Sequence, residues 1–184
     1  MNNNTNYNEF RKEVGEVNKA KGIHDKIYSY NHSLSLIFSE LYEAMEADRL
    51  GNRVDKINLD FEELHEIITQ NKAKYIEFYN KHIKGTVEEE LADAYLRLFD
   101  LAYVANVDLY YIDKSKLKEL TGEYITEDIL IIIEDVLMRS RKTQLSYLLN
   151  YIKQLSYKHN AFLKLHSRLK LDYNKLYINN KKKY

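Results

Sequence analysis

The stretch that decides the fold is residues 33–50, SLSLIFSELYEAMEADRL, which is followed by Gly51. Apolar side chains recur in it every three or four residues, the spacing that places them on one side of an α-helix. Glycine commonly ends a helix, because it adopts the left-handed conformation without strain. We therefore expect a buried helix over 33–50. Its apolar positions are Leu34, Ile37, Phe38, Leu41, Ala44 and Met45.

The rest of the sequence also favours helices. The chain has 184 residues, no Pro and five Gly, and neither residue type occurs after Gly122. Because turns between strands are usually rich in Gly and Pro, a sheet protein is disfavoured. We predict an all-α protein with a single domain over residues 1–184, and a short helix within 109–122. Further helical patterns cover 9–21, 58–83, 86–105, 126–138 and 143–178.

Composition excludes several classes of protein. The chain has no Cys, so it has no disulfide framework, no Cys-ligated zinc and no thiol catalysis. Its longest aliphatic run, residues 129–133, is far shorter than the roughly 20 apolar residues of a membrane span. The first residues lack the basic start and apolar stretch of a signal peptide. We therefore expect a soluble, cytoplasmic protein with no membrane partner.

The net charge of zero conceals two oppositely charged halves. Residues 1–108 contain 13 Lys and Arg against 20 Asp and Glu, whereas residues 109–184 contain 15 against 8. The two halves can simply attract each other, or they can together form a site for a metal ion and an anion. The charge pattern alone favours the first of these interpretations.

Two pairs of acids occur at i, i+3 spacing in separate expected helices, Glu40 with Glu43 and Glu90 with Asp93. In helical projection Glu40 and Glu43 lie among apolar neighbours, where an ionised carboxylate needs a cation, a proton or a metal. Glu90 and Asp93 project with Arg97 on the side opposite the apolar residues, which predicts a solvated face. Four carboxylates that faced one another would suit Mg²⁺, which prefers oxygen ligands.

These acids carry a resemblance to a known family. Residues 39–49, SELYEAMEADR, resemble the first carboxylate helix of the MazG-like all-α nucleoside triphosphate pyrophosphohydrolases, and residues 85–93, GTVEEELAD, resemble the second. A third stretch, 170–175, KLDYNK, is similar to the family's C-terminal Lys-x-x-Tyr-Asn element. The resemblance implies a MazG-like helical bundle. Residues from about 111 to 164 have no counterpart in it and would form an inserted helical hairpin.

The resemblance also implies an activity and a cofactor. The family hydrolyses a nucleoside triphosphate, such as a dNTP or a non-canonical NTP, to the monophosphate and pyrophosphate. Its ExxE and ExxD motifs match Glu40-x-x-Glu43 and Glu90-x-x-Asp93. By resemblance, these four acids are the catalytic residues and the ligands of Mg²⁺, with Mn²⁺ as a substitute.

Further residues are substrate contacts by resemblance. Lys170 is a candidate for phosphate, Asn174 for phosphate or sugar, and Tyr173 for packing beside the nucleotide. Lys170 and Asn174 are four residues apart and share one side of an expected helix. Arg97 is a fourth candidate, with the alternative that it only pairs with acids on its own helix. The family also implies a homodimer or homotetramer.

The sequence also has features of two other kinds of protein. A di-iron bundle needs two Glu-x-x-His motifs, and the chain has one, Glu62-x-x-His65. The second alternative is a non-catalytic helical interaction module that binds nucleic acid through the basic C-terminal third. Signatures of helix-turn-helix and zinc-finger proteins are missing, so nucleic acid is the less favoured partner.

Overall fold

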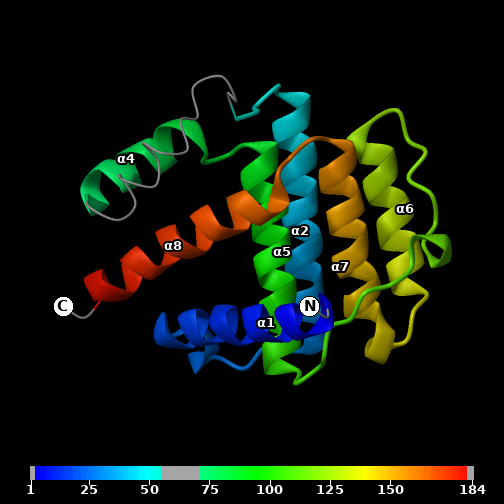
Figure 1. The fold of residues 1–184 in the computed structure, drawn as a ribbon, viewed down its shortest axis with the longest axis horizontal. Helices are drawn as coiled ribbons and strands as arrows, with labels where there is room; N and C mark the ends of the chain where they lie inside the picture. The colour runs from blue at the N-terminus through cyan, green and yellow to red at the C-terminus, as the bar shows by residue number, and fades with distance from the viewer. Residues whose placement is uncertain (1–2, 55–70, 182–184) are drawn as a thin grey trace.

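The computed structural model describes residues 3–54 and 71–181. The described residues contain no strand, so the predicted all-α class is confirmed. Residues 55–70, which include Glu62, His65 and the start of the helix expected over 58–83, lie outside the described residues. The helices are α1 (Asn3–Ala20), α2 (Tyr30–Arg49), α4 (Lys72–His82), α5 (Val87–Val104), α6 (Ile125–Leu137), α7 (Arg141–Lys158) and α8 (Leu163–Lys181), with 3₁₀ turns at Ile23–Asp25 and Lys114–Lys116 (Figure 1).

Helix α5 is the centre of the fold. Helices α1, α2, α7 and α8 all pack against it, and in Figure 1 α2 and α7 run alongside it while α1 and α8 cross it. Thr86 caps its start, and the Thr86 Oγ1 accepts a hydrogen bond from the Glu89 backbone N–H. Because neighbours cover α5 on several sides, even the acids of its first turn are buried. In the described part of the chain no helix is long and apolar enough to cross a membrane.

A smaller apolar cluster joins α4 to α8. The Tyr79 and Tyr173 rings stack with their centroids 4.1 Å apart, and the Tyr75 hydroxyl donates to the Leu169 carbonyl at 2.6 Å. Ile83, at the end of α4, is buried in the same cluster. These contacts fix α4 against the C-terminal helix.

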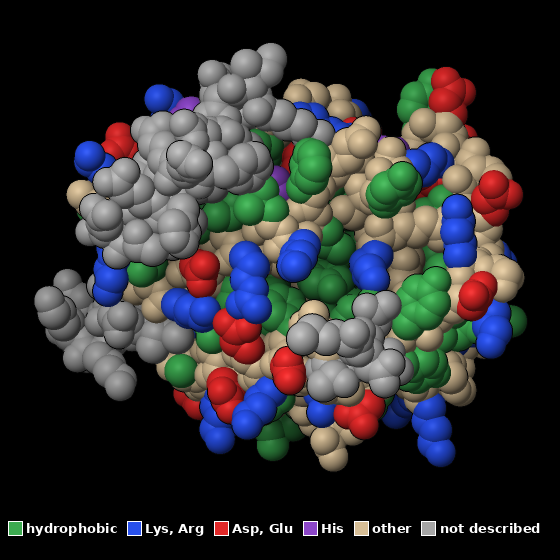
Figure 2. Space-filling model, viewed as in Figure 1, with side chains coloured by type: hydrophobic (Ala, Val, Ile, Leu, Met, Phe, Trp, Pro, Cys, Tyr) green, Lys and Arg blue, Asp and Glu red, His purple; other side chains and the backbone are tan. Residues whose placement is uncertain are grey.

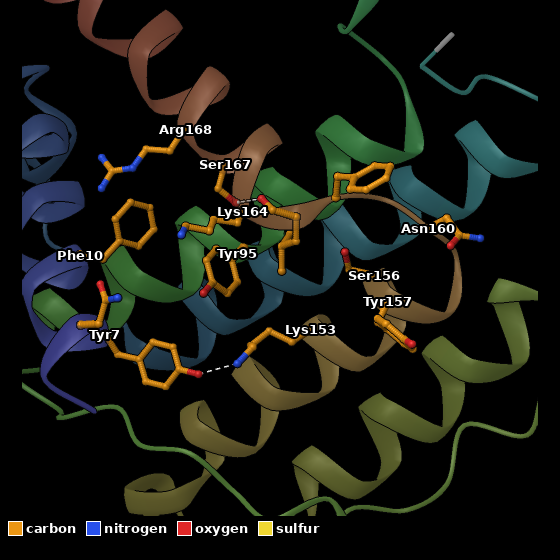
Figure 3. A pocket seen from close by; sticks show the side chains of 13 residues that line it. Tyr7, Phe10, Tyr95, Lys153, Ser156, Tyr157, Asn160, Lys164, Ser167 and Arg168 are labelled. Atoms are coloured by element: carbon orange, nitrogen blue, oxygen red, sulfur yellow. Dashed lines mark hydrogen bonds between the residues drawn. The ribbon is translucent and has the colours of Figure 1, made fainter. Parts of the chain in front are cut away.

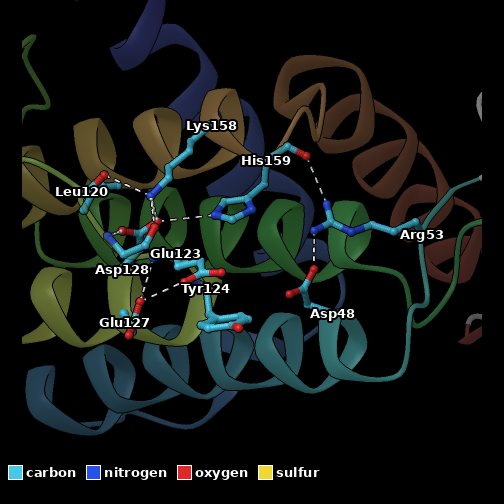
Figure 4. Close-up of polar contacts among 10 residues, drawn as sticks. Asp48, Arg53, Leu120, Glu123, Tyr124, Glu127, Asp128, Lys158 and His159 are labelled. Atoms are coloured by element: carbon cyan, nitrogen blue, oxygen red, sulfur yellow. Dashed lines mark hydrogen bonds and ion pairs between the residues drawn. The ribbon is translucent and has the colours of Figure 1, made fainter.

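The single helical pattern over 143–178 is two helices in the structure. Helix α7 ends at Lys158 and α8 begins at Leu163, because Asn160 and Phe162 adopt positive φ values of 54° and 41°. Asn tolerates this conformation better than most residues, whereas Phe rarely adopts it. The Arg53 guanidinium holds the turn by donating to the His159 carbonyl at 3.1 Å (Figure 4). The chain therefore turns between α7 and α8 although this segment contains neither Gly nor Pro.

The prediction of a short helix within 109–122 is wrong. This segment is irregular apart from the 3₁₀ turn at Lys114–Lys116, and α7 side chains satisfy much of its backbone. The Tyr151 hydroxyl accepts from the Lys118 N–H at 2.7 Å, and Asn150 donates to the Tyr110 carbonyl at 3.2 Å. Lys158 donates to the Leu120 carbonyl at 3.0 Å (Figure 4).

Helices α6 and α7 form a helical hairpin within 111–164. They pack against each other and are joined by residues 138–140. Helix α7 also packs on α5, and side chains from both hairpin helices belong to the main apolar core. The hairpin is therefore part of the central core and not an appendage to it.

Candidate active site

Acidic side chains from α2 and α5 converge at one place. One carboxylate oxygen from each of Glu40, Glu90 and Asp93 lies within 4.8 Å of the other two. Glu40 comes from α2 and the other two from α5, and these two helices pack against each other. The structure therefore brings together three of the four acids of the ExxE and ExxD motifs, and we call this group the carboxylate cluster.

Glu43 lies outside the carboxylate cluster. Projection placed it among apolar neighbours, but its side chain is exposed, whereas Glu40 is buried as expected. Helix α2 packs on α5 with the side that carries Glu40, and Glu43 lies beyond the edge of that contact. Its negative charge still helps to raise the pKa of Glu90.

Glu90 and Asp93 do not lie on a solvated face. Helices α1 and α8 pack on α5, and Glu90 is only 9% exposed. Burial, together with the nearby charges of Glu89 and Asp93, raises the pKa of Glu90 to about 8. Burial also raises the pKa of Asp93 to about 6, although Lys170 acts in the opposite direction. The expectation of a solvated face failed because projection considers one helix without its neighbours.

Two cations contact the carboxylate cluster. The Arg97 Nε donates to Glu40 across the α2–α5 interface. Lys170 Nζ, from α8, lies 2.6 Å from Asp93 Oδ2 and 2.6 Å from Glu89 Oε1. Although burial lowers it, these two carboxylates hold the pKa of Lys170 above its usual value. Lys170 is therefore charged, and both cations are held beside the acids.

Glu89 is a site residue that sequence reasoning missed. In the sequence, Glu89 forms a capping-box motif with Thr86, Thr86-x-x-Glu89, which marks only the start of a helix. In the structure the Glu89 carboxylate accepts from the Gly85 N–H at 2.5 Å, from the Tyr79 hydroxyl at 2.9 Å and from Lys170 at 2.6 Å. It therefore positions Lys170 as well as the helix start. The capping motif carries no signal for this second contact.

A cavity of about 250 Å³ lies beside the carboxylate cluster, between α1, α5 and α8. The cavity is lined by Asp93, Arg97, Lys170 and Asn174, together with Lys21, which directly follows α1. Lys21 Nζ donates to Asn174 Oδ1 at 3.0 Å. The cavity thus gathers three of the four expected substrate contacts, and Lys21 is an addition to them.

Tyr173, the fourth expected substrate contact, lies elsewhere. Its ring stacks on Tyr79, and its hydroxyl donates to Asn80 Oδ1 at 2.9 Å. It is 8% exposed and is not among the residues that line the cavity. In this structure Tyr173 joins α8 to α4.

Comparisons of the chain with protein-family models, with curated proteins and with solved structures found no match. The MazG-like resemblance therefore rests on the motifs at 39–49, 85–93 and 170–175. The first two stretches supply the acids of the carboxylate cluster. The third supplies Lys170 and Asn174, which line the cavity beside it.

Proposed function

We propose that this chain is a Mg²⁺-dependent nucleoside triphosphate pyrophosphohydrolase of the MazG-like family, which converts a dNTP or a non-canonical NTP to the monophosphate and pyrophosphate. The observation that carries the proposal is the approach of Glu40, Glu90 and Asp93 to within 4.8 Å of one another, beside a cavity lined by cations. Oxygen ligands suit the metal, and positive groups suit the phosphates.

The donor set fits Mg²⁺, with Mn²⁺ as a substitute. Glu40, Glu90 and Asp93 each offer a carboxylate oxygen, the ligand that Mg²⁺ prefers, and Glu43 adds negative charge nearby. Burial and the neighbouring carboxylates raise the pKa of Glu90 to about 8, and a bound cation would favour its charged form. When bound, Mg²⁺ would neutralise charge that develops on the phosphoryl oxygens and orient the attacking water.

We assign Arg97, Lys170 and Asn174 to the substrate. Carboxylates already hold the two cations at the cavity, Arg97 through Glu40 and Lys170 through Asp93. Neutralisation of these acids by a bound cation would let the guanidinium and ammonium groups bind phosphate oxygens instead. Asn174, which Lys21 fixes, would contact phosphate or sugar.

The reaction hydrolyses the anhydride bond between the α- and β-phosphates. The water oxygen bonds to phosphorus, the bond from that phosphorus to the bridging oxygen breaks, and pyrophosphate leaves. A carboxylate of the cluster accepts the proton of the water. Burial of the cluster strengthens each of these electrostatic interactions, because fewer water molecules screen them.

The test is pyrophosphate release from a panel of common and damaged dNTPs and NTPs, with Mg²⁺ and with EDTA. Glu40→Gln removes a cluster oxygen charge, and Glu46→Gln is its matched control, because Glu46 is an exposed acid on the same helix. We expect loss of turnover in the first variant only. Absence of pyrophosphate release from every triphosphate in the presence of Mg²⁺, or full turnover in Glu40→Gln, contradicts the proposal.

The same preparations separate the proposal from its alternative. A non-catalytic interaction module would bind DNA or RNA in a salt-sensitive manner without Mg²⁺. The resemblance also implies a homodimer or homotetramer, which we include in the proposal. Analytical ultracentrifugation measures the mass of the assembly and tests this part directly.

A further inference from the structure

A second cavity, of about 520 Å³, lies between α1, α5, α7 and the start of α8 (Figure 3). It shares no lining residue with the cavity beside the carboxylate cluster. Its volume lies in the range of roughly 300–1,000 Å³ that is typical of small-molecule sites. Figure 2 shows hydrophobic side chains in a hollow on this face of the molecule, with Lys and Arg side chains around it. We call it the aromatic cavity.

Aromatic rings form one wall of this cavity. Tyr7 and Phe10 come from α1 and Tyr95 from α5 (Figure 3). Phe10 and Tyr95 also contact the fully buried ring of Phe99, at centroid distances of 4.9 Å and 4.7 Å. Their rings are therefore fixed by the core, and rigid aromatic faces bind planar rings well.

Positive charge borders the same cavity without a matching negative charge. Lys153 Nζ donates to the neutral Tyr7 hydroxyl at 2.5 Å, and Lys164 has no ion pair or hydrogen-bond partner within the described residues. Arg168 is different, because both of its short contacts, at 2.7 Å, go to the Glu13 carboxylate. Among the described lining residues none is acidic. Lys153 and Lys164 therefore have no acidic partner among the residues that the structure describes.

The start of α8 adds to this positive potential. Leu163 and Lys164, the first two residues of the helix, line the cavity. The first backbone N–H groups of a helix carry partial positive charge and favour a nearby anion. The helix start and the two lysines thus both favour a negatively charged ligand.

We propose that the aromatic cavity binds an aromatic anion, a planar ring that carries a phosphate or a carboxylate. The ring packs against the wall formed by Tyr7, Phe10 and Tyr95, and the acidic group contacts Lys153, Lys164 and the first turn of α8. The site is separate from the carboxylate cluster and needs no metal. It therefore does not depend on the proposed hydrolase activity.

Isothermal titration calorimetry of the full chain in EDTA tests the proposal with four probes: AMP, 1-naphthoate, adenosine and inorganic phosphate. We expect AMP or 1-naphthoate to bind, and adenosine and phosphate to bind about tenfold more weakly or worse, since each lacks half of the recognised chemistry. AMP identifies a phosphate and 1-naphthoate a carboxylate as the acidic group. No binding of either aromatic anion, or phosphate binding as tight as AMP, overturns the proposal.

Variants locate the bound anion. The pair Lys153→Gln with Lys164→Gln should weaken binding about tenfold or more, whereas the charge-matched pair Lys12→Gln with Lys19→Gln, on the exposed side of α1, should leave it unchanged. Equal affinity in the two double variants would place the ligand elsewhere and refute the assignment. If the first pair fails to fold, Lys164→Gln alone serves, because its side chain has no partner to lose within the described residues.

Discussion

Buried acids occur in two parts of this molecule, and their surroundings differ. In α6, Asp128 accepts from the Gly122 N–H at 2.9 Å and from Lys158 at 2.6 Å (Figure 4). Asp135, also in α6, accepts from Arg139 at 2.7 Å and from the Tyr151 hydroxyl at 2.8 Å. Each of these carboxylates is paired with a cation and hydrogen-bonded, the arrangement in which a buried charge is tolerated.

The carboxylate cluster lacks this compensation. Glu40 and Asp93 have one cation each, and Glu90 has no ion pair or hydrogen bond of its side chain within the described residues. The pKa of Glu90 is raised to about 8 as a result of burial and neighbouring acids. We infer from the comparison that the acids of α6 stabilise the fold, whereas those of the cluster lower its stability and are available for the proposed metal binding.

The largest expected effect is on turnover. Glu90→Gln should lower the rate of pyrophosphate release about 10³-fold, because it removes a carboxylate that would carry negative charge when it binds the proposed metal. It should not unfold the protein, since burial and neighbouring acids already disfavour the charged form of Glu90, whose pKa is raised to about 8. Steady-state kinetics and circular dichroism check both parts. A folded variant with wild-type turnover would show that Glu90, like Asp128 and Asp135 of α6, is not needed for turnover, and would contradict the difference inferred between the two groups of acids.

The opposite result is expected for Asp128→Asn. This change leaves Lys158 without its carboxylate partner and should lower the free energy of unfolding by about 3 kcal/mol. Turnover per folded molecule should stay at the wild-type level. Urea unfolding provides the measurement, and Glu123→Gln, which changes an exposed acid in the same region, is the control. Equal stability of the two variants would show that the α6 network contributes little.

The pH dependence of stability sharpens the comparison further. Glu90 has a pKa of about 8 in the folded chain against an ordinary value of 4.5, so between these pH values the folded state holds a proton that the unfolded state has lost. The free energy of unfolding therefore falls as pH rises through this window, by at most about 1.4 kcal/mol per pH unit. The pKa of Asp93 is raised to about 6, so this residue contributes a change of the same sign to the free energy of unfolding at lower pH.

Glu90→Gln should flatten this profile above pH 6, where Asp93 no longer contributes. Urea titrations at several pH values between 5 and 8.5 give the slope for the wild type, for Glu90→Gln and for the control Glu46→Gln. The control should keep the wild-type slope. A wild-type slope in Glu90→Gln would mean that another group takes up the proton.

The smallest expected effect is metal-linked stability. Mg²⁺ at ten times its dissociation constant should stabilise the wild type by about 1.4 kcal/mol, because it binds the folded state alone. Glu90→Gln should lose most of this gain, and Asp128→Asn should retain it in full. Differential scanning fluorimetry with and without Mg²⁺ gives the shift in Tm. An equal shift in all three proteins would indicate binding outside the cluster.

The contrast between Glu40 and Glu90 shows what the sequence can predict. Glu40 was placed correctly, because it lies on the side of α2 that packs on α5. Glu43 was not, because it lies beyond the edge of that contact and is exposed. Glu90 was placed wrongly, because α5 has neighbours on several sides, and a single-helix projection treats every polar side as solvated. The helical class follows from composition and spacing, whereas burial of a central helix depends on tertiary packing.

Two other features depend on contacts between distant segments. The 109–122 segment forms no helix of its own, because α7 side chains such as Asn150 and Tyr151 bind its backbone. The aromatic cavity draws Phe10, Tyr95 and Lys164 from three helices, and no local pattern marks them as neighbours. The ExxE and ExxD motifs could be read from the sequence because each lies within a single helix.

Helix α8 forms part of both cavities, with Lys164 at one and Lys170 at the other. At a rise of 1.5 Å per residue these two positions are about 9 Å apart along the axis. An α-helix is stiff over this length, so an axial slide of α8 would carry both linings the same way and by the same amount. The spacing between the two cavity linings is therefore fixed by a single stiff helix.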